Sequence, residues 1–192
     1  MNKNPFIGIA GNIGVGKTTF TSYLAKEFDF IDIYESVSDN PYLSDFYSDM
    51  KRWSFNLQIY FLHHRFASIN TMVKNLNRGV VQDRTIYEDV EIFSKNLYNI
   101  GYMDKRDWNT YSELFNNMTN FIRRPDLIIY LKADLDILLK RINQRDREYE
   151  AKIDPVYLEQ LNDLYDSWIK EIDWTEVMII DTNNFNIYKD TK

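Results

Sequence analysis

The stretch GNIGVGKTT at residues 11–19 follows directly after the apolar run FIGIA, and it constrains the fold more than any other part of the sequence. Two glycines separated by four residues and followed by Lys17 and Thr18 have the spacing of a phosphate-binding loop between a strand and a helix. In such a loop the backbone N–H groups surround the β-phosphate, and the helix N-terminus adds a favourable dipole. Lys17 reaches the β- and γ-phosphates, and the Thr18 hydroxyl can ligate Mg²⁺. The sequence therefore predicts a nucleoside triphosphate site at Gly11, Asn12, Ile13, Gly14, Val15, Gly16, Lys17, Thr18 and Thr19.

Strand-like apolar runs alternate with helical patterns along the rest of the chain. This alternation predicts an α/β fold with a five-stranded parallel sheet covered by helices on both faces, as in a three-layer P-loop kinase fold or an NTPase, and the fold alone does not choose between the two. A chain of 192 residues fits a single domain over residues 1–192. We expect strands at 5–10, 30–36, 79–84, 125–133 and 176–181, and helices at 17–28, 53–77, 86–99, 106–122, 134–145 and 155–172.

Composition excludes several classes of protein. The net charge of −6 argues against a broad nucleic-acid-binding face. The chain has no Cys and therefore no disulfide or thiolate metal site. His63 and His64 diverge by about 100° on a helix, which favours packing or solvation over a metal pair. No run approaches the ~18 apolar residues of a membrane span, and the N-terminal strand does not resemble a signal peptide. We expect a cytoplasmic protein with no nucleic-acid or membrane partner.

Acidic residues end several of the predicted strands, where ligands bind in parallel α/β sheets. Glu35 ends the second strand and can orient an acceptor hydroxyl and take its proton, although a helix cap or surface acid has the same pattern. Asp83 ends the third strand and can bind Mg²⁺, directly or through water. Arg84 can keep Glu35 ionised and contact the acceptor, or form a structural pair with Asp83. Asp181 ends the fifth strand.

Three arginines, Arg141, Arg145 and Arg147, lie within seven positions of an otherwise acidic chain. Guanidinium groups suit phosphate oxygens and a transferring phosphoryl group, so the pattern predicts an Arg-rich lid over the triphosphate at about residues 141–152. Acidic residues are interleaved with these arginines, and a solvated charged face remains the alternative.

Gln58 and Arg65 share one stripe of the helix WSFNLQIYFLHHRF. An amide can pair with a nucleobase edge and an arginine can donate to base oxygens or ring nitrogens. Polar residues on a solvent-facing surface would produce the same pattern, so the stripe alone leaves both interpretations open.

Together these stretches resemble the deoxyribonucleoside kinase family, and they are most similar to its bacterial deoxyadenosine/deoxyguanosine kinase branch. The resemblance runs in family order over about residues 6–186, through GNIGVGKTT, YES, YSDMKRWSFNLQIYFLHHR, QDRTIYED, RINQRDREYE and DTNNF. The phosphate-binding loop is unspecific, whereas the helix with Trp, Gln and Arg followed by QDRTIYED is much more specific.

The resemblance implies roles at the reacting hydroxyl and the sugar. Glu35 looks like the base on the 5′-hydroxyl, and Arg84 like the arginine that contacts this hydroxyl and the base. Asp83 matches an acidic residue near Mg²⁺. Tyr47 and Glu150 match a pair that holds the deoxyribose 3′-hydroxyl, which would reject acceptors that lack this group.

The resemblance also implies how the nucleobase and the donor are held. Gln58 matches the amide that grips the base edge, Trp53 and Phe93 resemble pocket walls, and Arg65 and Asp89 match a pair that discriminates between bases. The implied preference is for purine deoxynucleosides or deoxycytidine over thymidine. For the donor, Arg141 and Phe185 look like the slot around the ATP adenine, while Arg145 and Arg147 match the lid arginines. The family further implies Mg²⁺ and a homodimer formed through helices after the second and third strands.

The leading hypothesis is therefore an ATP-dependent deoxynucleoside 5′-kinase. A nucleoside monophosphate kinase, such as a thymidylate kinase, is the main alternative, but its phosphorylated acceptor needs an extra cation. The stretch ESVSDNPYL after the second strand offers no Arg or Lys before Lys51, which disfavours that acceptor. An inactive structural subunit is a further alternative that the presence of Lys17, Glu35 and Arg84 disfavours. A nucleotide-dependent switch or motor is another, but the lid arginines and the small size of the chain fit a self-contained kinase better.

Overall fold

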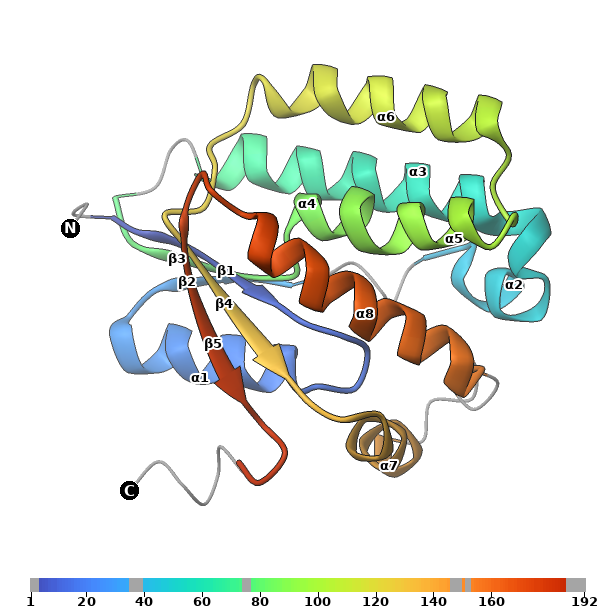
Figure 1. Ribbon diagram of the computed structural model, residues 1–192. Helices are drawn as coiled ribbons and strands as arrows, with labels where there is room; N and C mark the ends of the chain where they lie inside the picture. Colours follow the sequence, from blue (N-terminus) through green and yellow to red (C-terminus); the bar gives the residue numbers. More distant parts are fainter. Residues whose placement is uncertain (1–3, 35–39, 74–76, 146–149, 151–152, 186–192) are drawn as a thin grey trace.

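The computed structural model describes residues 4–34, 40–73, 77–145, 150 and 153–185. Five parallel strands form one sheet in the order β2-β3-β1-β4-β5 (Figure 1). Because β1 lies in the middle, the loop that follows it leaves the sheet between two neighbouring strands, where ligands bind in folds of this type. The strands are β1 (Phe6–Ala10), β2 (Ile31–Ile33), β3 (Val80–Asp83), β4 (Leu127–Lys132) and β5 (Glu176–Asp181).

Helices cover both faces of the sheet, as the sequence predicted (Figure 1). Successive side chains of β4 point to opposite faces of the sheet, and the buried residues therefore form two clusters, one on each face. Ile128 and Tyr130 belong to the larger cluster, and Ile129 and Leu131 to the smaller one with Phe20 of α1. The helices are α1 (Lys17–Phe28), α2 (Leu43–Ser48), α3 (Met50–Ser68), α4 (Ile86–Glu88), α5 (Lys95–Asn99), α6 (Lys105–Thr119), α7 (Leu135–Arg145) and α8 (Pro155–Glu171), with π-helical segments η1 (Ile69–Val73) and η2 (Asp89–Ser94).

The segment between β2 and β3 differs most from the sequence prediction. The sequence predicts a turn at 38–43 before a helix at 53–77, but α2 forms first, and α3 already begins at Met50. Leu43 and Phe46 of α2 are buried in the core, so tertiary packing stabilises a short helix in a stretch rich in turn residues. Asp49 then caps α3 by accepting a hydrogen bond from the Arg52 backbone N–H at 3.0 Å.

The second strand is also shorter than predicted. It ends at Ile33, and the expected strand-end position of Glu35 lies outside the described residues. β2 is an edge strand that pairs only with β3 among the described strands, so fewer ladder hydrogen bonds extend it.

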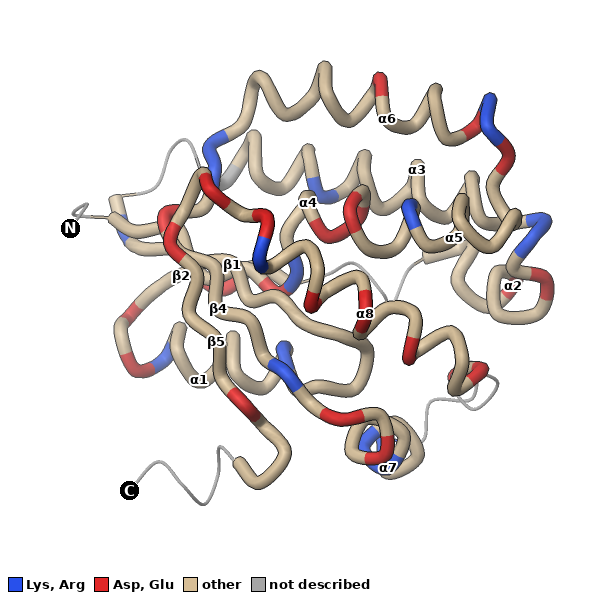
Figure 2. The backbone as a smooth tube through the Cα atoms, viewed as in Figure 1, with Lys and Arg blue, Asp and Glu red and all other residues tan. Residues whose placement is uncertain are grey.

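The distribution of charge is interleaved in the described chain. Figure 2 shows Lys and Arg positions scattered over several elements among Asp and Glu positions. None of the helices in this part of the chain combines the length and the apolar character that a membrane crossing requires.

Helix α8 supplies a test of the core. Leu161 is fully buried in the larger cluster, so Leu161→Ala should lower the free energy of unfolding by about 2–5 kcal/mol through lost burial and a residual cavity. Val156 on the same helix is 56% exposed, so Val156→Ala should change stability by less than about 0.5 kcal/mol. Urea unfolding of both variants measures the difference, and equal values would contradict the assigned core.

Candidate active site

The loop between β1 and α1 has the backbone that the glycines of the sequence motif permit. Gly11, Gly14 and Gly16 have φ values of 146°, 83° and 104°, a region that other residues rarely adopt. A Cβ at Gly11 would lie 2.6 Å from the Leu131 carbonyl oxygen, so the close approach of β4 also requires glycine. The loop thus turns tightly at the carboxyl end of the central strand, and α1 begins directly after it at Lys17.

Lys17 and Thr18 are held by groups on both sides of the loop. The Lys17 ammonium donates to the carbonyl oxygens of Gly11 and Asn12, at 2.8 and 2.9 Å. The Thr18 hydroxyl donates to Asp83 Oδ2 at 2.6 Å, which brings together the two predicted metal ligands from α1 and β3. The other carboxylate oxygen, Asp83 Oδ1, is buried and accepts no hydrogen bond from the described residues. A free carboxylate oxygen beside a hydroxyl fits Mg²⁺, which binds through one or two carboxylates together with substrate phosphates and water.

A first cavity, which we name the donor cavity, has a volume of about 690 Å³ and lies against the loop. Arg141 of α7 donates to the Val15 carbonyl oxygen at 3.1 Å and to the Thr182 hydroxyl at 3.0 Å, so it ties the loop to the exit of β5. Burial lowers the pKa of the Arg141 guanidinium. The described residues that line this cavity are Gly14, Val15, Gly16, Lys17, Thr18, Thr19, Phe20, Leu131, Arg141, Gln144, Arg145, Thr182 and Phe185.

Asn12 and Ile13 complete the predicted loop residues. Asn12 is buried, and its amide donates to the Leu158 carbonyl oxygen at 2.9 Å and to Asn162 Oδ1 at 2.7 Å, which fastens the loop to α8. Ile13 instead lines a second cavity on the other side of the loop.

This second cavity, which we name the acceptor cavity, measures about 270 Å³ and is walled by aromatic and apolar side chains together with a similar share of polar and charged ones. Apolar walls with polar groups that fix the orientation of the ligand are typical of small-molecule sites. It shares Gly14, Lys17, Thr18 and Arg145 with the donor cavity, so the two meet at the loop. The described lining is Ile13, Gly14, Lys17, Thr18, Tyr34, Leu43, Phe46, Tyr47, Leu57, Gln58, Phe61, Asp83, Arg84, Asp89, Phe93, Arg145, Glu150 and Tyr157.

Arg84 enters the acceptor cavity from a strained turn. Its φ of 65° is left-handed, which is uncommon outside glycine. The Arg84 backbone N–H donates to the Ile9 carbonyl oxygen at 3.0 Å, and the guanidinium carbon lies 4.1 Å from the centroid of the Phe93 ring. Strain of this kind persists where the surrounding structure over-determines it, often at functional sites. The turn therefore holds a buried cation over an aromatic wall of the cavity.

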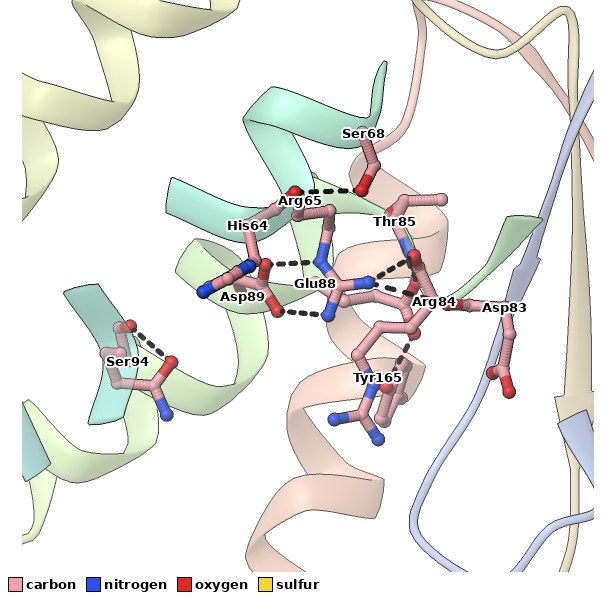
Figure 3. A network of polar contacts seen from close by, with 11 residues as sticks. His64, Arg65, Ser68, Asp83, Arg84, Thr85, Glu88, Asp89, Ser94 and Tyr165 are labelled. Atoms are coloured by element: carbon pink, nitrogen blue, oxygen red, sulfur yellow. Dashed lines mark hydrogen bonds and ion pairs between the residues drawn. The ribbon is translucent and has the colours of Figure 1, made fainter. Parts of the chain in front are cut away.

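Arg65 and Asp89 form a buried bidentate ion pair (Figure 3). Arg65 Nε donates to Asp89 Oδ2 at 2.6 Å and Nη2 donates to Oδ1 at 3.2 Å. Arg65 Nη1 also donates to the Arg84 carbonyl oxygen at 2.8 Å. Asp89 lines the acceptor cavity, whereas Arg65 is not among the described lining residues. Arg65 thus braces both Asp89 and the turn at Arg84, and the role of this pair in discriminating between bases stays a prediction.

The remaining predicted residues divide into several groups. Gln58, Tyr47 and Phe93 line the acceptor cavity, and Gln58 Oε1 accepts from the Ser94 hydroxyl at 3.1 Å. Trp53 instead packs beneath Arg52, 4.4 Å from its guanidinium carbon, and is not among the described lining residues.

In the predicted lid segment, Arg145 Nε donates to Glu150 Oε2 at 3.0 Å. This ion pair lies between the two cavities, because Arg145 lines both and Glu150 lines the acceptor cavity. Glu35 and Arg147 lie outside the described residues.

The sequence prediction missed three residues next to the site. Glu88 is fully buried and accepts hydrogen bonds from the Gly11 and Thr85 backbone N–H groups, at 3.2 and 2.6 Å. Tyr165 of α8 contacts the same glycine, and Tyr157 lines the acceptor cavity with a hydroxyl whose pKa is raised by burial. Thr85 and Glu88 form a capping box that the sequence signature could have revealed, whereas no local pattern identifies the two tyrosines.

A phosphate-binding loop bordered by a donor cavity and an acceptor cavity defines a P-loop phosphotransferase. The model of the deoxynucleoside kinase family matches residues 7–192, and the chain belongs to that family. The chain is 43% identical over 190 residues to a deoxyadenosine/deoxycytidine kinase of Bacillus subtilis, covering 98% of this chain and 87% of the relative. It is 41% identical over 175 residues to a deoxyguanosine kinase of the same organism, covering 90% and 82%.

Solved structures agree with this assignment. A deoxyadenosine kinase from M. mycoides with bound dATP superposes with a TM-score of 0.86 at 31% identity, covering 96% of this chain and 94% of the other. The same enzyme with the products dCMP and dCDP superposes with a TM-score of 0.87 at 32% identity, covering 95% and 93%. The protein is therefore an enzyme that phosphorylates deoxynucleosides with ATP, and the nucleoside monophosphate kinase alternative is not favoured.

Two glycines allow the loop to be tested separately from the fold. Gly16 and Gly101 both have positive φ values, and no heavy atom lies within 4 Å of the place that a Cβ would take, so alanine at either position should cost about 1–2 kcal/mol of stability. Only Gly16 lies in the phosphate-binding loop, so Gly16→Ala should also lower kcat/KM for ATP by about tenfold or more. Steady-state kinetics and urea unfolding of both variants measure this. A matching kinetic loss in Gly101→Ala would contradict the assignment of the loop.

Proposed function

We propose that the enzyme transfers the γ-phosphate of Mg²⁺-ATP to the 5′-hydroxyl of a deoxynucleoside whose base is a purine or cytosine. One observation carries this proposal: a single aromatic-walled cavity is lined both by Lys17 and Thr18 of the loop and by the polar groups of Gln58 and Asp89. An acceptor whose base contacts the latter pair would direct its sugar toward the phosphate donor. Positioning of this kind supplies most of the catalysis in phosphoryl transfer.

At the reacting atoms we assign Glu35 as the base that orients the 5′-hydroxyl and accepts its proton. Arg84 contacts this hydroxyl and the substrate, which is supported by its place in the lining beside Asp83. Lys17, Arg145 and Arg147 stabilise the charge that develops on the phosphoryl oxygens, the last two from a lid at about residues 141–152. The donor adenine lies between Arg141 and Phe185, which both line the donor cavity.

Thr18 and Asp83 would hold Mg²⁺, because their oxygens lie together and Asp83 Oδ1 is available for coordination. The ion, when bound, neutralises charge on the phosphates. Asp83 and Thr18 come from different elements, so the fold rather than the ion positions them.

The base preference follows from the hydrogen-bonding groups of the cavity. The carboxylate of Asp89, held by Arg65, accepts hydrogen bonds and suits the exocyclic amine of adenine, guanine or cytosine. Thymine presents a carbonyl oxygen instead of an amine, so a buried acceptor would face another acceptor. The names of the Bacillus subtilis relatives, which act on deoxyadenosine, deoxycytidine and deoxyguanosine, support the same preference.

We further propose that residues 1–192 act as one domain, that the enzyme is a cytoplasmic homodimer, and that its partners are the deoxynucleoside and ATP rather than nucleic acid or membrane. The net charge of −6 and the interleaved charges of Figure 2 support the absence of an extended basic face in the described chain.

A coupled ADP-release assay tests the substrate proposal. Deoxyadenosine, deoxyguanosine and deoxycytidine should be turned over, and thymidine should have a kcat/KM lower by at least about tenfold, because its carbonyl oxygen would face the Asp89 carboxylate, one acceptor against another. Deoxyadenosine monophosphate serves as the control for a phosphorylated acceptor and should not be turned over. Efficient use of thymidine or of the monophosphate would overturn the proposed acceptor site.

The predicted recognition of the 3′-hydroxyl gives a second test. Tyr47 and Glu150 both line the acceptor cavity, so 2′,3′-dideoxyadenosine should have a kcat/KM at least about a hundredfold below that of deoxyadenosine. In Glu150→Ala this ratio should shrink toward one, because the carboxylate proposed to bind the 3′-hydroxyl is gone. Glu159 is exposed on α8, and Glu159→Ala serves as the control that keeps the ratio. An unchanged ratio in Glu150→Ala would contradict the assignment.

A further inference from the structure

The side-chain amide of Gln58 is held at one of its two ends in the wall of the acceptor cavity. The hydroxyl of Ser94, the last residue of η2, donates to Gln58 Oε1 at 3.1 Å (Figure 3). Gln58 is buried and makes no other hydrogen bond with the described residues. Because Gln58 lines the acceptor cavity, the other end of the amide, the Nε2 donor, is left for a ligand in that cavity.

Tyr111 of α6 provides the second part of this arrangement. Its side chain is fully buried, and its hydroxyl makes no hydrogen bond of ordinary geometry with a described residue. Burial, with the Asp89 charge as a smaller cause, raises the pKa of Tyr111, so the phenol keeps its hydrogen. The Ser94 hydroxyl lies close enough to lower the same pKa. Ser94 Oγ is therefore the acceptor that the described surroundings offer to the phenol hydrogen.

A serine hydroxyl can both donate and accept, so Ser94 alone would tolerate either end of the amide. Tyr111 removes this freedom. When Tyr111 donates to Ser94 and Ser94 donates to Gln58 Oε1, every hydrogen of the chain has an acceptor. In the reverse direction Gln58 Nε2 would donate to Ser94 and Ser94 to Tyr111, and the phenol hydrogen would be left without an acceptor in the core. Leaving a buried polar group unsatisfied is costly, so the amide keeps Nε2 toward the cavity.

This orientation matters because nucleobases present two opposite patterns of hydrogen-bonding groups. Adenine and cytosine have an exocyclic amine beside a ring nitrogen without hydrogen, whereas guanine and thymine have a carbonyl oxygen beside a ring N–H. The Nε2 donor suits the bare ring nitrogen and opposes the N–H. Asp89, whose carboxylate accepts from an amine in the proposed function, selects in the same direction.

We propose that Ser94 and Tyr111 are positioning residues that fix the orientation of the Gln58 amide, so that the acceptor site favours a base with a bare ring nitrogen beside its exocyclic amine. Deoxyadenosine and deoxycytidine have this pattern and should be better acceptors than deoxyguanosine and thymidine. Neither Ser94 nor Tyr111 is among the described lining residues of the cavity, so both act through Gln58. This inference rests on the proposed function of the cavity as the deoxynucleoside site.

The first test compares deoxyadenosine with deoxyinosine, which has a carbonyl oxygen and a ring N–H in place of the amine and the bare nitrogen. The wild-type enzyme should prefer deoxyadenosine by at least about a hundredfold in kcat/KM. In Ser94→Ala this ratio should fall by about tenfold, because the released amide can turn Oε1 toward the ring N–H.

Ser54→Ala is the matched control for Ser94→Ala. Ser54 is fully buried one turn before Gln58 on α3, and its hydroxyl donates to the Met50 carbonyl oxygen instead of the amide. This variant should keep the wild-type ratio. An unchanged ratio in Ser94→Ala, with equal losses for both nucleosides, would assign Ser94 a packing role and overturn the inference, and so would the same fall in Ser54→Ala.

The second test is a double-mutant cycle on the same ratio. Tyr111→Phe keeps the ring and removes the hydrogen, so it should lower the ratio several-fold in the wild-type background but not in the Ser94→Ala background. Equal falls in both backgrounds would overturn the role of Tyr111.

The wild-type enzyme alone distinguishes the two levels of the argument. If it phosphorylates deoxyadenosine and deoxyinosine equally well, the acceptor site stands and the inference about the amide fails. If it phosphorylates no deoxynucleoside, the proposed function fails instead.

Discussion

The register of β1 against β3 is the constraint on which the rest of the site depends. Ile9 pairs with Asp83, so the phosphate-binding loop leaves β1 directly beside the end of β3. Because side chains alternate along a strand, Asp83 points to the same face of the sheet as Val81, where α1 packs and Thr18 lies. A slip of one residue would turn Asp83 to the opposite face and separate it from Thr18. The parallel pairing thus positions the proposed metal ligands before any ion or nucleotide binds.

Buried charged residues hold the side chains of the acceptor cavity in place at the same carboxyl edge of the sheet. Arg65 and Asp89 are almost fully buried, and breaking such a pair leaves an uncompensated charge, at a cost of about 3–5 kcal/mol. Arg65 also holds the carbonyl oxygen of Arg84, and Glu88 accepts from the neighbouring Thr85 backbone N–H. The strained turn at Arg84 is therefore supported on both sides by hydrogen bonds to the side chains of Arg65 and Glu88. This explains how one left-handed residue can hold a guanidinium over an aromatic wall with little freedom to move.

Local patterns in the sequence predicted most of the fold, and the failures have physical reasons. The helix after the loop has the predicted bounds, Lys17–Phe28, because glycine conformations set its start and apolar spacing its length. Helix α2 was missed because Leu43 and Phe46 gain stability from tertiary burial that short-range propensity does not reveal. Trp53 packs against Tyr42 and the larger core cluster, and its expected place in the cavity wall, which came from family resemblance, stays a prediction. Glu88 and Tyr165 contact Gly11 from 77 and 154 residues away, a separation that no sequence pattern bridges.

The two cavities share Gly14, Lys17, Thr18 and Arg145. This sharing limits how far kinetic measurements can assign the effect of a substitution to the donor or to the acceptor. A change in a shared side chain alters the surroundings of both substrates, so it should move both KM values and gives little information about either role. Glu88 and Tyr165 reach Gly11 without lining either cavity among the described residues. Glu88 also accepts a hydrogen bond from the Thr85 backbone N–H beside Arg84, and the Tyr165 ring meets the ring of Phe93, so both residues contact the loop and the wall of the acceptor cavity. These two residues therefore couple the loop to the acceptor cavity rather than acting on donor binding alone.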